Sequence, residues 1–69
     1  MSGHTYSVSE IVGTSPNSID EAVRNGIAAA GQTVRNLDWF EVQSIRGHLD
    51  DGGVADWQVT LKFGFRLER

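Results

Sequence analysis

The C-terminal part of the chain alternates strictly between apolar and polar residues, a pattern typical of a β-strand with one buried face. Every second residue from Trp57 to Leu67 is apolar or aromatic. This apolar row consists of Trp57, Val59, Leu61, Phe63, Phe65 and Leu67. Because a shift of one residue would turn the whole row into water, the pattern predicts a strand with one defined buried face.

Two earlier segments alternate in a similar way and predict two further strands. The first runs from Thr5 to Gly13 and the second from Trp39 to Leu49. Between the second and third strands, residues 50–53 read Asp-Asp-Gly-Gly, and their Asp-Gly and Gly-Gly pairs supply the positive φ angles of tight hairpins. The last two strands are therefore predicted to be antiparallel neighbours.

A helix is predicted between the first two strands, and its start has two candidate caps. Ser15 precedes Pro16, which suits the first helical position, while Ser18 and Glu21 have the spacing of a capping box. Apolar residues then recur at steps of three and four over about five turns. This stripe consists of Ile19, Ala22, Val23, Gly26, Ile27, Ala30, Val34 and Leu37. Its small residues should let the helix lie close to a sheet.

The order strand, helix, strand, strand predicts a single α+β domain that fills residues 1–69. The crossover helix makes strands one and two parallel, and the hairpin reverses strand three. With strand three in the centre, the subunit is a three-stranded antiparallel sheet wrapped around one helix. One helix covers only one sheet face, so the other face is a candidate subunit contact or ligand wall.

A chain of 69 residues builds only a small core, which is marginally stable on its own. The usual supplements are disulfides, a structural metal or self-association. The sequence has no cysteine, and its only histidines are His4 and His48. Self-association remains, and we therefore expect a homo-oligomer.

Charge and hydropathy argue against nucleic acid and membrane partners. Six Lys and Arg stand against nine Asp and Glu, for a net charge of -3, and no basic cluster could follow a phosphate backbone. No apolar run approaches the roughly 20 residues that span a bilayer, and the start of the chain lacks the pattern of a secretory signal. With the absence of cysteine, these features predict a cytoplasmic protein.

Trp39 lies at the junction between the predicted helix and the second strand. Its indole could plug the end of the helix as part of the core. It could instead stack on a flat ring, an interaction that contributes roughly 1–3 kcal/mol. Sequence position leaves both roles open.

Three polar residues on the predicted strands are candidate ligand contacts. The Gln58 amide can both donate to and accept from the edge of a pyrimidine-like ring. Arg46 and Arg66 could hold a phosphate through their forked guanidinium groups. Each could also be a solvated strand residue, which is the commoner role of such side chains.

Catalytic constellations are scarce. The sequence has no cysteine nucleophile, no serine with recognisable His and acid partners, and no glycine-rich phosphate loop between strand and helix. The two histidines are not at metal-ligand spacing. We therefore expect neither a catalytic nor a metal site.

Several segments, spread over nearly the whole chain, resemble the dodecin family. They are EIVGTS at residues 10–15, LDWFEV at 37–42, IRG at 45–47, QV at 58–59 and GFRLE at 64–68. The combination of LDWFEV with a downstream IRG and a terminal GFRLE is specific for a chain of this length.

The resemblance implies a β-α-β-β subunit that assembles, as a homododecamer, into a hollow sphere with cubic-type symmetry. Dodecins bind flavins in pairs at subunit contacts and are not known as enzymes. In bacterial members the ligand is mainly flavin mononucleotide (FMN). The implied roles are storage, buffering and photoprotective quenching of FMN or riboflavin.

By the same resemblance, five residues would form the flavin site. Trp39 matches the tryptophan that stacks on the isoalloxazine ring, with a symmetry-related copy enclosing two flavins. Gln58 matches the glutamine that hydrogen-bonds the pyrimidine edge of the ring. Arg46 and Arg66 match arginines near the polar tail or phosphate of the flavin, and Asp38 is a further candidate beside Trp39.

The chain departs from the family pattern at a possible second ligand site. Some bacterial dodecins also bind coenzyme A through basic residues on strand one and the helix. Ser7, Ala29 and Gln32 stand where the resemblance would place some of that charge, which argues against coenzyme A. Three alternatives to flavin storage stay open: a pure assembly or interaction protein, a coenzyme A-binding module without flavin, and a flavin-dependent enzyme.

Overall fold

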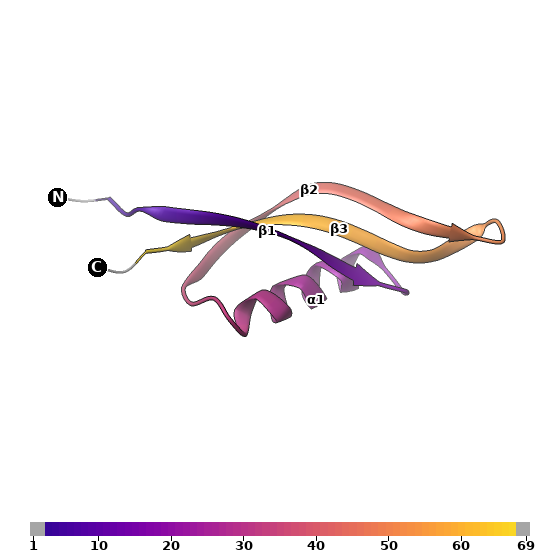
Figure 1. Ribbon diagram of the computed structural model, residues 1–69, viewed down its shortest axis with the longest axis horizontal. Coiled ribbons are helices and arrows are strands. Elements are labelled where there is room, and N and C mark those ends of the chain that lie inside the picture. Colours follow the sequence, from indigo (N-terminus) through magenta and orange to yellow (C-terminus); the bar gives the residue numbers. More distant parts are fainter. Residues whose placement is uncertain (1–2, 68–69) are drawn as a thin grey trace.

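The computed structural model describes residues 3–67, which form three strands and one helix. In chain order these are β1 (Tyr6–Ser15), α1 (Ile19–Gly31), β2 (Leu37–Asp50) and β3 (Gly53–Arg66). Figure 1 shows the sheet as one layer with α1 on one side of it, and the β2–β3 hairpin extending past the helix. The predicted β-α-β-β order is confirmed.

β3 lies at the centre of the sheet, in the strand order β1-β3-β2. It pairs antiparallel with both neighbours, so β1 and β2 run in the same direction. The predicted α+β class and the three-stranded antiparallel sheet packed on one helix are therefore confirmed.

The two hairpin strands are longer than the alternation predicted. β2 begins at Leu37 rather than Trp39, and β3 begins at Gly53 rather than Trp57. The added residues at the start of β3 have no buried face in the subunit, so no alternation marks them as a strand. The turn itself is only two residues long, with positive φ angles of 53° at Asp51 and 78° at Gly52.

The helix begins after Ser18, whose Oγ accepts a hydrogen bond from the Glu21 backbone N–H at 3.0 Å. Ser18 is thus the N-cap. The other half of the predicted capping box is absent, because the Glu21 carboxylate accepts hydrogen bonds from Ser15 Oγ and from Asn17 Nδ2. The bond from Ser15, followed by that from Asn17, lowers the pKa of Glu21. These contacts tie the end of β1 to the first turn of α1.

The helix ends at Gly31 after 13 residues, so the prediction of about five turns was wrong. Val34 and Leu37 continue the helical spacing but lie beyond the helix, and Leu37 packs against the core from β2. Apolar spacing cannot separate a helical residue from a strand residue that packs on the same core. Within residues 3–67, no helix is long and apolar enough to cross a membrane.

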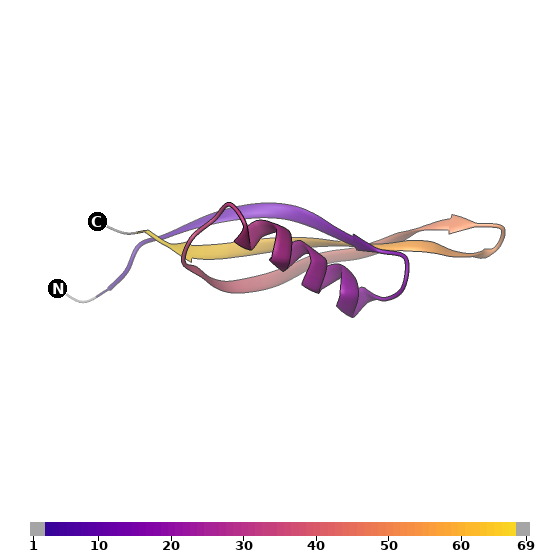
Figure 2. The same ribbon diagram turned by 90° about the horizontal axis from the view of Figure 1, so that it is seen from below.

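α1 lies across β1 and β3, as the view in Figure 2 shows. The approach is close because Gly26 of the helix meets Gly13 of β1, where a Cβ on Gly13 would overlap the Ala22 carbonyl oxygen. This confirms the prediction from the small residues of the stripe. The buried apolar core consists of Ala22, Ala30, Val59, Leu61 and Phe63.

β2 contributes no buried residue to this core. Leu37 is half-buried, and every later residue of the strand is exposed. Phe40 and Val42 pair with Phe63 and Leu61, so they lie on the core face of the sheet, yet they are 48% and 41% exposed. In one subunit the helix-side face of β2 is therefore an uncovered apolar row.

Candidate ligand-binding face

The candidate residues lie on the sheet face that points away from α1. On β3, Gln58, Gly64 and Arg66 alternate with the buried apolar row, so they point to the opposite side. Trp39 of β2 pairs with Gly64, and Arg46 pairs with Gln58. Since residues directly opposite each other share a face, both join this helix-free face.

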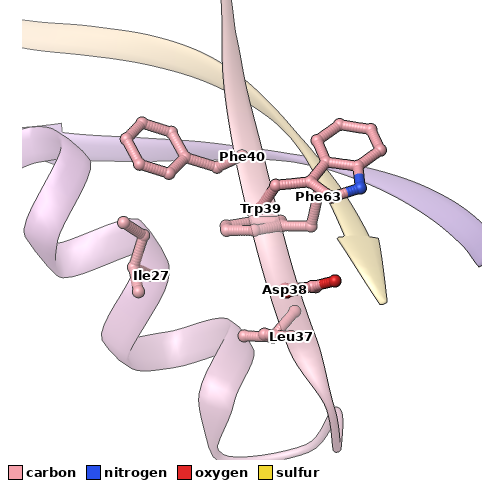
Figure 3. A pocket seen from close by; sticks show the side chains of 6 residues that line it. All are labelled: Ile27, Leu37, Asp38, Trp39, Phe40 and Phe63. Atoms are coloured by element: carbon pink, nitrogen blue, oxygen red, sulfur yellow. The ribbon is translucent and has the colours of Figure 1, made fainter. Parts of the chain in front are cut away.

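A β-bulge places Asp38 and Trp39 there together. The pairing register shifts between Leu37 and Trp39, which inserts one extra residue into β2. Figure 3 shows the result: Asp38 and Trp39 point away from α1, whereas Leu37 and Phe40 point towards it. The strand can therefore present a charged and an aromatic side chain side by side.

The Trp39 indole lies over Gly64 of the central strand. A Cβ at residue 64 would overlap three bonded ring atoms, Cε2, Cζ2 and Nε1, so glycine alone leaves room for the ring. Trp39 is nevertheless 42% exposed. The strand thus supports one side of the indole and leaves the rest to solvent.

Sequence reasoning missed Gly64 as a functional residue. In the sequence Gly64 enters only as part of the GFRLE segment, although a glycine inside a strand often marks a close approach of another group. That signal was present in the sequence. Its partner could not be named, because the β-bulge that sets Trp39 opposite Gly64 leaves no pattern of its own.

Asp38 is held by a residue from the other edge of the sheet. Tyr6 of β1 donates its O–H to Asp38 Oδ2 at 2.9 Å. This hydrogen bond raises the pKa of Tyr6, with further contributions from desolvation and the Asp38 charge, while Arg66 opposes the shift. Asp38 and Arg66 also line one small pocket of about 170 Å³.

Arg46 and Gln58 form a second group nearer the hairpin turn. Arg46 Nε donates to Gln58 Oε1 at 3.4 Å, and Gln58 Nε2 lies 3.3 Å from His48 Nδ1. His48 Nδ1 in turn lies 3.3 Å from Asp56 Oδ1. From the sequence, His48 is expected to be an exposed side chain near the end of the second strand, and the structure confirms that it is exposed on β2. Its contact with Gln58 depends on the register of β2 on β3.

The two groups are far apart within one subunit. Gln58 and Gly64, which supports Trp39, are six residues apart on β3, or about 20 Å at the rise of an antiparallel strand. The pocket in Figure 3, which Trp39 and Asp38 help to line, measures about 150 Å³. That is below the roughly 300 Å³ at which ligand pockets usually begin. Gln58 does not line this pocket, so Trp39 and Gln58 do not meet in it within one chain.

Comparison with known proteins agrees with this architecture. The family model described as Dodecin matches residues 5–68. The chain belongs to the dodecin family.

Individual dodecins match over almost their full length. The structure of dodecin from Streptomyces coelicolor is 62% identical with a TM-score of 0.94, and covers 100% of this chain and 99% of that one. Dodecin from Streptomyces davaonensis is also 62% identical, with a TM-score of 0.93 and coverage of 99% and 100%. Dodecin from Thermus thermophilus is 47% identical over 66 residues, or 96% of each chain.

Proposed function

We propose that this dodecin assembles into a homododecamer that binds FMN or riboflavin at subunit contacts and stores it in the cytoplasm without catalysing a reaction. The observation that carries the proposal is the Trp39 indole, held over Gly64 and open to solvent beyond it. A ring supported in this way offers a flat apolar surface of the kind on which another aromatic ring stacks.

The other candidates complete the contacts that a flavin requires. Gln58 would hydrogen-bond the pyrimidine edge of the ring, since its amide offers a donor and an acceptor. Arg46 and Arg66 would bind the polar tail or phosphate, with Asp38 beside the ring. A bound flavin would supply a light-absorbing, redox-active ring, and contact with an indole gives its excited state a route for quenching. Coenzyme A is not part of the proposal, because Ser7, Ala29 and Gln32 carry no charge.

Self-association is supported by the uncovered row on β2. Phe40 and Val42 continue the core face beyond the edge of the helix. Burying this row against another copy would add the apolar contacts that a 69-residue subunit lacks. It would also allow Trp39 of one subunit and Gln58 of another to meet at one ligand.

The test combines size-exclusion chromatography with absorption and fluorescence. The oligomer peak should take up FMN, absorb in the visible, and quench FMN fluorescence on titration. Replacing Trp39 by alanine should weaken binding roughly ten- to hundredfold, as expected for lost stacking, whereas Trp39→Phe should weaken it less. Trp57→Phe is the matched control, because it removes the other tryptophan from the helix side of the sheet.

Two outcomes would contradict the proposal. A stable oligomer that ignores flavin would instead indicate an assembly or interaction protein. Unchanged FMN affinity in a folded Trp39→Ala oligomer would remove Trp39 from the site.

A further inference from the structure

We propose that Tyr6 is a positioning residue of the flavin site: through its hydrogen bond to Asp38, it holds the β-bulge of β2 in the conformation that lays Trp39 over Gly64. The inference rests on the proposed flavin function and gives a role to a residue that the proposed flavin contacts leave out. It is carried by the 2.9 Å bond from the Tyr6 O–H to Asp38 Oδ2, together with the place of Asp38 in the bulge.

The bulge is the part of β2 whose shape the sheet itself fixes least. Leu37 pairs with Phe65 and Trp39 pairs with Gly64, and Asp38 is the extra residue between these two pairs. The extra residue of a bulge is left out of the ladder, so backbone pairing does not hold it in place. β2 also lies at the edge of the sheet. A side-chain contact to Asp38 can therefore decide how the backbone runs into Trp39.

The contact comes from β1, on the far side of the central strand. β3 separates β1 from β2, so the two edges are two strand spacings, or about 10 Å, apart. Tyr6 pairs with Arg66 and so lies on the helix-free face. Its phenol reaches over β3 to the Asp38 carboxylate, 32 residues away in the sequence. Because hydrogen bonds to an ionised acceptor are stronger than neutral ones, this bond ties the two edges together at the level of the bulge.

Trp39 is the residue that this tie would hold most directly. It follows Asp38 in the chain, and both side chains point away from α1 (Figure 3). Its indole lies against Gly64, which has no side chain to lock the rotamer of the ring, so the place of the ring depends on where the backbone of β2 starts it. By holding Asp38, Tyr6 would lower the entropy that the indole loses when a flavin stacks on it.

An effect through Arg66 is the alternative that the test must exclude. Arg66 lies beside Tyr6 on the same face and lines a small pocket with Asp38, where it is the candidate partner of a phosphate. Riboflavin and FMN separate the two explanations, because they share the ring and only FMN carries a phosphate. A disordered Trp39 weakens both ligands by the same factor, whereas a displaced Arg66 weakens FMN alone.

The test removes the hydroxyl group and keeps the ring. Tyr6→Phe should weaken the binding of both riboflavin and FMN to the intact oligomer about three- to tenfold, as expected for one lost hydrogen bond. Fluorescence titration measures the affinities, and size-exclusion chromatography checks that the oligomer persists. Ser9→Ala is the control, because it removes a hydroxyl group of β1 from the helix side of the sheet, opposite Phe63. It should keep both affinities.

A second measurement follows the indole without ligand. The chain has two tryptophans, so in a Trp57→Phe background Trp39 is the one that remains. Tyr6→Phe should weaken its near-ultraviolet circular dichroism band, at wavelengths that tyrosine does not absorb, because a mobile indole averages its surroundings. A residue that only stabilised the fold would lower the melting temperature and leave this band of the native protein unchanged.

Asp38→Ala breaks the same bond from its other end and tests whether Tyr6 acts through it. Adding Tyr6→Phe to Asp38→Ala should change neither the Trp39 band nor the riboflavin affinity any further, since the bond is already lost. A full effect of Tyr6→Phe in that background would overturn the inference.

The outcomes also distinguish this inference from the proposed function. If the parent protein binds riboflavin and Tyr6→Phe binds it equally well, or if only the FMN affinity falls, Tyr6 does not position Trp39 and flavin storage stands. If the parent protein binds neither flavin, both proposals are wrong.

Discussion

The two strands of the hairpin have the same length, 14 residues each, but opposite environments. β3 lies between two strands and under the helix, and its apolar row supplies Val59, Leu61 and Phe63 to the core. β2 lies at the edge of the sheet and has no buried residue, although it is also rich in apolar side chains. Burial here is decided by the position of α1, which lies over β1 and β3.

This difference divides the molecule into two functional parts. β1, α1 and β3 form a packed unit in which the helix and the central strand cover each other. β2 carries exposed side chains on both of its faces: an apolar row on the helix side and Trp39 and Arg46 on the other. In the proposed function, the first part makes the subunit fold and the second meets other subunits and the ligand.

The sharpest test of this division is the core of β3. Leu61 is fully buried, and Leu61→Ala should destabilise the protein by about 2–5 kcal/mol, since it removes buried methyl groups and leaves a cavity. Chemical denaturation measures the loss. Leu49→Ala on the exposed end of β2 is the control and should change stability by no more than about 0.5 kcal/mol. Equal losses of stability at the two positions would contradict the contrast between a buried β3 and an exposed β2.

A charge in the apolar row of β2 should affect assembly more than folding. Phe40→Asp places a carboxylate on the helix-side face, where burial against another copy would require its desolvation. We expect the oligomer to dissociate to smaller species, measured by light scattering, while the circular dichroism of the subunit is retained. Glu41→Gln, on the neighbouring residue that points to the opposite face, should leave the mass unchanged. An intact Phe40→Asp oligomer would place the subunit contact elsewhere.

Gly64 connects the two parts, because a residue of β3 supports a side chain of β2. Gly64→Ala introduces a Cβ where the indole of Trp39 lies, so the ring must move. We expect FMN affinity to fall about tenfold while the fold is kept, which corresponds to about 1.4 kcal/mol of lost stacking. Fluorescence titration measures the affinity. Thr60→Ala on the same face of β3 is the matched control, and a similar loss there would mean that the support of Trp39 is not specific.

The smallest expected effect is a change of stability at low pH, and it involves Glu21 in the packed unit of β1, α1 and β3. The pKa of Glu21 is lowered in the folded protein, first by its bond from Ser15, so its stabilising contribution is present above the ordinary value of 4.5. This contribution is lost as the pH falls from there through the lowered pKa. Thermal melts should therefore show Glu21→Gln less stable than the parent protein at pH 7, and the difference in melting temperature should shrink below pH 4.5. A difference that stays constant with pH would mean that the shape of the side chain, and not its charge, causes the effect.

The sequence predicted well the features that local patterns record. The alternation from Trp57 to Leu67 identified the central strand and its buried face, and Ser18 was one of two caps proposed for α1. The end of the helix was predicted wrongly, because Val34 and Leu37 keep a helical spacing outside it. The resemblance identified the family, which the match of residues 5–68 confirms.

The arrangement of the candidate site was beyond sequence reasoning for a physical reason. Which residues of β2 face which residues of β3 depends on three register shifts, and none of them leaves a periodic signal. Gly64 under Trp39 and His48 beside Gln58 follow from that register. The roles of Trp39, Gln58, Arg46, Arg66 and Asp38 in flavin binding stay predictions.

Along β3, about 20 Å separates Gln58 from Gly64, the residue that supports Trp39. This distance affects how subunit assembly and ligand binding depend on each other. In the proposed function, one chain would offer half of the flavin-binding surface at each of two places, and a flavin would need a second chain to be held. Ligand and neighbouring chains would then stabilise one another by mass action. Under that proposal, the assembly would be less stable when free flavin is scarce and more stable when it is abundant.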